Sequence, residues 1–209
     1  SPDVLNRCVE DLACLGMDCE IIDALPFALS RAVQFIDPTV SNGPVAALDW
    51  GAGHPSFVVV NEDGPILTRS LRGCGLGTAI DQIQTQLSID EMECAQLLTT
   101  CGIQAAGKVT SRIAEQIGRN IADSLDQLID QLQRTLAFAD QRGVKPKHIW
   151  LFGCGGTIAG MDQALSAQLD IEVRNWQLAP EQLARPLASL PAHAIFGAAV
   201  GFSLLNRNA

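Results

Sequence analysis

Basic residues are scarce in this sequence, in which 14 Lys and Arg stand against 23 Asp and Glu, for a formal net charge of −9. Proteins that bind nucleic acid or an anionic membrane surface do so through a basic patch. We therefore expect no nucleic-acid partner. The partners should instead be proteins or small molecules.

Closely spaced cysteine pairs and long apolar runs are also missing. The seven cysteines include no C-x-x-C pair, which fits neither a disulfide framework nor a zinc site and favours a reducing cytosol. No basic-then-apolar signal segment opens the sequence, and its longest apolar stretch, residues 192–205, is shorter than the ~20 residues that span a bilayer. We therefore expect no direct membrane insertion.

Strand-like and helix-like segments alternate along the chain, and this alternation is typical of an α/β fold. The expected strands are residues 19–22, 45–50, 56–61, 66–72, 148–152 and 171–176. The expected helices are residues 4–15, 26–35, 113–138, 160–169 and 192–205, one containing residues 76–87, and one after a capping box that begins at Ser88. A linker over residues 37–44 contains two prolines and separates the opening segment from the rest.

The first of two glycine-rich strand ends reads LDWGAGHPSF over residues 48–57. A carboxylate at a strand end, here Asp49, can hold Mg²⁺ through water or orient an attacking water. Gly51 and Gly53 let amide groups approach phosphate oxygens, and the Ser56 hydroxyl can add a donor. The alternative is a plain hairpin turn in which Asp49 caps the turn.

The second glycine-rich strand end reads LFGCGGTIAGM over residues 151–161. It follows a strand and precedes a helix, so its amides should lie near a helix N-terminus, which attracts anions. The segment contains no G-x-x-x-x-G-K-[ST] and is therefore no P-loop. In the G-x-G-x-x-G spacing of the Rossmann pattern, Ile158 takes the place of the third glycine. The alternative is a tight strand-to-helix turn without a ligand.

Together, the two strand ends resemble a known family. The sequence resembles the PilM family of type IV pilus assembly proteins in its order of elements and in three short motifs. These motifs are CEIIDA at residues 19–24, LDWG at residues 48–51, and LFGCGGTIAGM at residues 151–161, which corresponds to the family's L-S-G-G-G-A-x-L-P-G-L. The resemblance implies an actin-like ATPase (ribonuclease H-like) lobe, with a mixed sheet flanked by helices, in an incomplete two-lobe fold. Residues 1–40 would be the remnant of the first lobe, 41–190 the second lobe, and 191–209 a closing helix that packs back toward the first.

The resemblance also implies a cofactor, ATP with Mg²⁺, and a role for each matching residue. Asp49 would take the catalytic and metal-water role. The nucleotide-binding residues would be Gly51, Gly53 and Ser56 on the phosphate side, Gly153, Gly155 and Gly156 on the adenosine side, and Glu93 as the acid of an E-x-x-K contact to the nucleoside.

Several departures from the family pattern bear on activity. The first-lobe phosphate hairpin with its own D-x-G is absent, Gln96 stands where the lysine of E-x-x-K belongs, and Trp50, His54 and Pro55 are expected to crowd the first turn. The three histidines are scattered, which favours surface or turn positions over metal ligation. We expect this chain to be a fragment that is inactive, or at most a weak ATPase in a full-length protein.

The function implied by the resemblance is a cytoplasmic, actin-like scaffold of a type IV pilus or secretion-type assembly, gated by ATP. Its partner would be an inner-membrane assembly protein, which would make it peripheral to that membrane. Two alternatives are a phosphotransferase of the sugar-kinase type and a degenerate module that has lost the nucleotide. Because a lone exposed strand invites exchange between copies, a homo-oligomer or swapped dimer is also expected.

Overall fold

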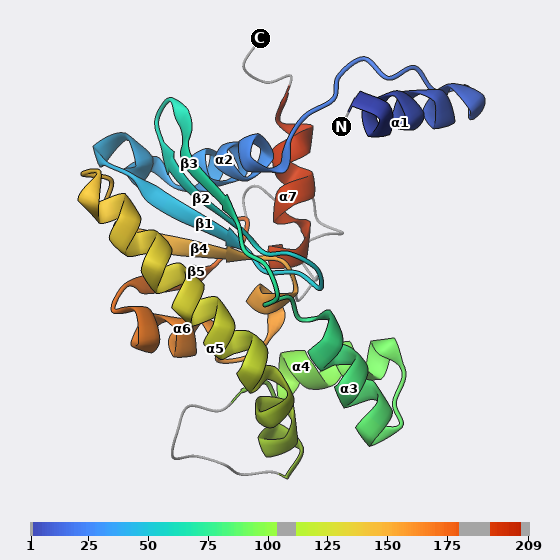
Figure 1. The fold of residues 1–209 in the computed structure, drawn as a ribbon, viewed down its shortest axis with the longest axis vertical. Coiled ribbons are helices and arrows are strands. Elements are labelled where there is room, and N and C mark those ends of the chain that lie inside the picture. The colour runs from blue at the N-terminus through green and yellow to red at the C-terminus, as the bar shows by residue number, and fades with distance from the viewer. Residues whose placement is uncertain (1, 104–111, 180–192, 206–209) are drawn as a thin grey trace.

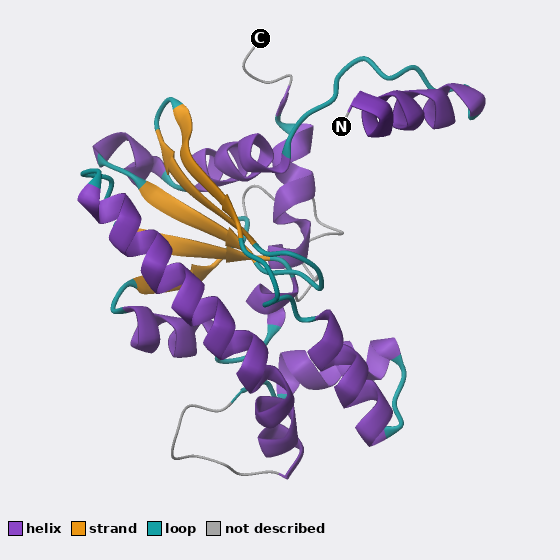
Figure 2. Ribbon diagram, viewed as in Figure 1, coloured by secondary structure: helices purple, strands orange, loops and turns teal. Residues whose placement is uncertain are grey.

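The computed structural model describes residues 2–103, 112–179 and 193–205 of the chain (Figures 1 and 2). Its helices are α1 (Pro2–Cys14), α2 (Leu25–Ile36), α3 (Gly77–Leu87), α4 (Glu91–Thr100), α5 (Arg112–Gln141), α6 (Met161–Leu169) and α7 (His193–Ser203), with 3-10 turns η1 (Pro38–Asn42) and η2 (Cys154–Thr157). Its strands are β1 (Val45–Asp49), β2 (Ser56–Asn61), β3 (Gly64–Ser70), β4 (His148–Phe152) and β5 (Glu172–Asn175).

The five strands form one mixed sheet in the order β3-β2-β1-β4-β5. The pairs β1–β2 and β2–β3 are antiparallel, whereas β1–β4 and β4–β5 are parallel. The carboxyl ends of β1, β4 and β5 therefore lie at one edge of the sheet, where ligands of open α/β sheets bind. The expected mixed sheet flanked by helices is confirmed.

Helices cover both faces of the sheet, with α2 and α7 on one side and α5 and α6 on the other (Figure 1). Alternation along β1 divides its side chains between two apolar clusters, because successive residues of a strand point to opposite faces. Ala46 and Leu48 pack on the α5 side, whereas Val45 and Ala47 pack with Leu29 of α2. The strands β1 and β4 lie inside the sheet, and β1 is buried on both faces.

One expected strand is absent from the described residues. Residues 19–22 form no ladder and belong to an extended segment between α1 and α2. A strand requires a hydrogen-bonding partner, and no described strand lies beside this segment. The prediction of a strand here was wrong, although α1 and α2 on either side of it were predicted within two residues of their ends.

The cap of α4 also differs from expectation. Ser88 has φ 55° and ends α3, so the N-cap of α4 is Asp90, whose carboxylate accepts from Glu93 N while Glu93 accepts from Asp90 N. Within the expected linker, residues 38–42 form the 3-10 turn η1.

The division of the chain at residue 40 stays a prediction. Helix α2, which precedes that boundary, packs against the sheet and α7. The boundary at residues 190 and 191 lies outside the described residues.

Candidate functional site

Asp49 and Gly153 meet at the carboxyl edge of the sheet. Asp49 is the last residue of β1 and pairs with Phe152, the last residue of β4. A Cβ atom on Gly153 would lie 2.6 Å from Asp49 Oδ1, and Gly153 has φ +75°. Only glycine leaves room for the carboxylate at this backbone conformation. The structure thus brings together the two strand ends that the sequence singled out.

The Asp49 carboxylate has no partner among the described residues. Burial raises the pKa of this carboxyl group, and no neighbouring charge or hydrogen bond offsets the effect. A partly buried carboxylate without a cation or donor is costly, and a bound cation would stabilise its ionised form. Shifted groups of this kind are enriched at functional sites.

The turn after β1 presents a row of amide groups. The N–H groups of Gly51, Ala52, Gly53 and His54 donate no hydrogen bond within the described part of the chain. The carbonyl oxygens of Gly51 and Ala52, by contrast, accept from Leu76 N at 3.0 Å and Gly77 N at 2.9 Å. This turn therefore offers donors to an anion, as a backbone nest does.

Space around the turn agrees with this arrangement. A Cβ atom on Gly51 or Gly53 would meet no atom within 4 Å. Ser56 follows as the first residue of β2, directly opposite Asp49 in the ladder. Gly75 was not among the predicted site residues, yet a Cβ atom there would lie 1.8 Å from Gly53 O. The only sign of this in the sequence was the glycine itself, just before α3. Because Gly75 has no side chain, the start of α3 can lie directly against the first turn and hold it in place.

The second glycine-rich turn works differently from the expectation. The amides of Gly153, Gly155 and Gly156 donate to Ala194 O at 3.0 Å, Trp50 O at 2.8 Å and Gly153 O at 3.1 Å. A Cβ would lie 2.7 Å from Trp50 Cε3 at Gly155 and 2.6 Å from Ala194 Cβ at Gly156. These glycines serve close packing, and their amides are already engaged. A nucleotide could contact these residues only through atoms other than the engaged amides. Such a contact stays a prediction.

Trp50 does not crowd the first turn, which corrects the expectation. Its indole is fully buried and donates from Nε1 to Cys74 O at 2.7 Å. The ring packs closely against Gly155. Pro55 is also buried, and only His54 of this group is exposed.

Glu93 takes part in the capping box of α4. Its carboxylate accepts from Asp90 N at 3.1 Å, which satisfies an otherwise unpaired amide at the helix start. Glu93 and Gln96 are both exposed. A contact from Glu93 to a nucleoside stays a prediction, and it would compete with this cap.

Metal-ligating side chains form no cluster at the site within the ranges that the structure describes. No group of three or more His, Cys, Asp and Glu that could hold a metal ion occurs among the described residues. Mg²⁺ commonly binds through one or two carboxylates together with water and phosphate oxygens. Asp49 alone therefore fits a water-mediated Mg²⁺ that arrives with a nucleotide.

His148 was expected at a surface or turn and is instead buried. It is 4% exposed, and its Nε2 lies 2.7 Å from Asp37 Oδ2. This pair lies at the start of β4, at the opposite edge of the sheet from Asp49. It belongs to the structural core and not to the candidate site.

Comparison with known proteins supports the fold. No family model and no curated protein sequence matches the chain. Among solved structures, a PilM–PilN type IV pilus biogenesis complex matches with TM-score 0.70 and 19% identity, over 96% of this chain and 56% of that chain. MreB 5 of Spiroplasma citri bound to AMPPNP matches with TM-score 0.65 and 11% identity, over 97% and 64%.

A third solved structure, the ethanolamine utilization protein EutJ from Carboxydothermus hydrogenoformans, matches with TM-score 0.61 and 16% identity, over 95% of this chain and 60% of that chain. The chain therefore has an actin-like fold and spans less than two thirds of these proteins. The predicted structural resemblance to PilM is confirmed. No helix among the described residues has the length and apolar character needed to cross a membrane.

Proposed function

We propose that this chain is the nucleotide-facing lobe of an actin-like scaffold protein that works in type IV pilus or secretion-type assembly. The proposal rests on the likeness to PilM, a protein solved in a pilus biogenesis complex with PilN. Its partner would be a protein of the inner membrane that assembles the pilus or secretion machine. The scaffold itself would be cytoplasmic and reach that membrane through this partner.

The nucleotide part of the proposal is carried by one observation. An unpaired, partly buried carboxylate, Asp49, adjoins a turn whose four consecutive amide groups have no acceptor within the described residues. Amides directed at phosphate and a carboxylate directed at hydrated Mg²⁺ are the two elements that a Mg-ATP site requires. Among the solved neighbours, MreB 5 of Spiroplasma citri is bound to AMPPNP in one structure and to ADP in another.

Calorimetric titration with Mg-ATP tests the nucleotide site. We expect weak binding that Asp49→Asn reduces by about 10- to 100-fold, the range typical of losing a group that orients a metal site. The loss should shrink when the same titration uses ATP without Mg²⁺, because Asp49 acts through the ion.

Asp63→Asn is the matched control, since Asp63 is exposed in the turn between β2 and β3 and should leave the affinity unchanged. No heat with the wild type, or equal affinity for the wild type and Asp49→Asn, would contradict nucleotide binding at this edge.

Photo-crosslinking in cells that make the native protein tests the partner. We expect the principal product to contain a membrane-anchored pilus or secretion assembly protein. Identification by mass spectrometry should show the same product after the cells are lysed and the membranes are washed. Crosslinks found only to soluble metabolic enzymes would contradict the scaffold role and favour the sugar-kinase alternative.

A module that has kept the fold without the nucleotide is the second candidate, and one observation favours it. The amides of Gly153, Gly155 and Gly156 in the second glycine-rich turn all donate to carbonyl oxygens of the chain itself. The calorimetric titration separates the two candidates, because this module would give no heat with Mg-ATP.

A further inference from the structure

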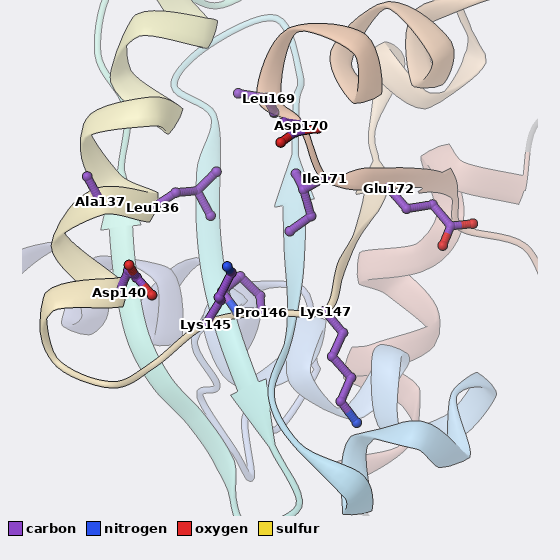
Figure 3. Close-up of a pocket in the computed structure, with 10 residues that line it drawn as sticks. All are labelled: Leu136, Ala137, Asp140, Lys145, Pro146, Lys147, Leu169, Asp170, Ile171 and Glu172. Carbon is purple, nitrogen blue, oxygen red and sulfur yellow. The ribbon is translucent and has the colours of Figure 1, made fainter.

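A pocket of about 620 Å³ lies at the edge of the sheet opposite to Asp49 (Figure 3). Its walls come from the last turns of α5, the loop before β4, and the turn between α6 and β5. None of these residues belongs to the candidate nucleotide site. The pocket is therefore a separate surface feature with its own chemistry.

The floor of the pocket is apolar. Leu136, Leu169 and Ile171 are partly buried and pack against the apolar cluster on the α5 side of the sheet. Figure 3 shows Leu136 and Ile171 at the centre of the pocket, between α5 and the α6–β5 turn. Such a floor accepts an aliphatic chain, since burying CH₂ groups there removes them from water.

Two of the charged residues around the pocket are occupied elsewhere. Lys147 donates from Nζ to Asn42 O at 2.6 Å, and Glu172 pairs with Arg174 at 2.6 Å. Both side chains extend away from the centre in Figure 3. The charges left to face a ligand are thus those of Asp140, Asp170 and Lys145.

The remaining charges favour a cation. The carboxylates of Asp140 and Asp170 and the ammonium of Lys145 have no hydrogen bond or ion pair to any described residue. Two negative groups therefore oppose one positive group in a protein of net charge −9. An anionic ligand would meet Lys145 but also both carboxylates.

Two helix ends add to the negative potential. Helices α5 and α6 both end at the pocket, and neither has a basic residue in its last turn. Helix C-termini carry partial negative charge from unpaired carbonyl groups and are stabilised by nearby cations. Both ends and both carboxylates thus point to the same sign of ligand.

We propose that this pocket binds a lysine or arginine side chain of a partner polypeptide, with the aliphatic stem on the Leu136–Leu169–Ile171 floor and the cationic head between Asp140 and Asp170. Long cationic side chains bury their stems on apolar surface and keep the charge in a polar setting. The pocket offers both environments side by side. An apolar residue next to the basic one in the partner would cover the rest of the floor.

NMR titration of the full chain with labelled methyl groups tests the chemistry of the pocket. We expect n-butylammonium to shift the methyl signals of Leu136 and Ile171 with millimolar affinity, as befits so small a ligand. Pentanoate, a probe of similar length with the opposite charge, should leave them in place. Pentanoate binding as tightly as n-butylammonium, or no shift with either probe, would overturn the proposal.

Three variants sharpen the test. Asp140→Asn and Asp170→Asn should each weaken n-butylammonium binding by about two- to fivefold, the effect of a partly exposed ion pair. Lys145→Gln should strengthen it, because a like charge is removed, whereas weaker binding would show that the pocket prefers anions. Asp123→Asn, an exposed position of α5 outside the pocket, is the control and should change nothing.

A blocked tripeptide separates a polypeptide partner from a free amine. Acetyl-Leu-Arg-Leu-amide should bind more tightly than n-butylammonium, and the peptide with neutral citrulline in place of arginine should bind more weakly. A peptide that binds no better than n-butylammonium would contradict the assignment to a polypeptide side chain.

Discussion

At the scale of single residues, a buried polar cluster surrounds Asp37. This carboxylate is 5% exposed and accepts from Thr39 N at 2.9 Å, Thr39 Oγ1 at 2.6 Å and Trp150 Nε1 at 2.8 Å, with His148 Nε2 at 2.7 Å. Burial opposes its ionisation, but the hydrogen bonds outweigh burial and lower the pKa of Asp37 from 3.8 to about 2. The cluster joins the end of α2 to the start of β4.

The lowered pKa predicts the pH range over which Asp37 stabilises the fold. Its shift corresponds to about 2 kcal/mol of stability. This contribution is complete above the unfolded pKa of 3.8 and is lost as the pH falls through about 2. We expect Asp37→Asn to lower the free energy of unfolding by about 2 to 4 kcal/mol near neutral pH, measured by urea denaturation.

The same pair of proteins compared at acid pH provides the check. The difference between the wild type and Asp37→Asn should become smaller at about pH 2.5, because the wild-type carboxyl group is then partly protonated. Asp63→Asn should behave like the wild type at both pH values, since Asp63 is exposed. A constant difference at both pH values would show that Asp37 acts through packing alone.

The placement of single residues was predictable only where it depends on neighbours in sequence. Asp49 was recognised because it ends a strand and precedes two glycines. The burial of His148 was not, because its partner Asp37 is 111 residues away. Trp50 likewise reads as a bulky turn residue in sequence. Its inward position is explained by Cys74 O, a partner 24 residues downstream.

At the scale of elements, the apolar pattern predicted most strands and helices but not which elements pair or pack with each other. The bounds of β2 and β4 agree with the expectation, since each is an apolar run that turn residues delimit. The expected strand at residues 19–22 failed because pairing depends on a neighbour that patterning cannot supply. The prediction of the α4 cap failed for a local reason. Both Ser88-x-x-Glu91 and Asp90-x-x-Glu93 match the capping-box pattern, and the structure uses the second.

The candidate site shows the same limit. The proximity of its two strand ends was predictable, because parallel strands bring their carboxyl ends to one edge. The direction of the amide groups was not. Within the described part of the chain, the N–H groups of residues 51–54 in the first turn have no acceptor, whereas those of Gly153 and Gly155 in the second turn donate to Ala194 O and Trp50 O. This difference depends on tertiary packing, and it moves the proposed anion-binding role toward residues 51–54.

At the scale of the whole molecule, α1 lies apart from the body of the protein (Figure 1). Its apolar side chains Val4, Leu5 and Val9 are 61%, 46% and 38% exposed. The segment that follows, up to α2, also exposes Ile21 and Ile22 at 54% and 51%. An exposed apolar surface on a tethered helix favours association with a second copy.

Removing residues 1–22 should therefore leave the body intact and abolish self-association. We expect the thermal midpoint of the truncated chain to stay within about 2 °C of the full chain, because little packing energy is lost and 1 kcal/mol moves the midpoint of a domain this size by roughly 2–4 °C. Light scattering should show dimers for the full chain and monomers after truncation.

A double substitution in the full chain, Val4→Ser with Leu5→Ser, is the matched control and should also give monomers. A midpoint that falls by many degrees would instead mean that α1 packs on the body, and monomers in every case would rule out exchange through this segment.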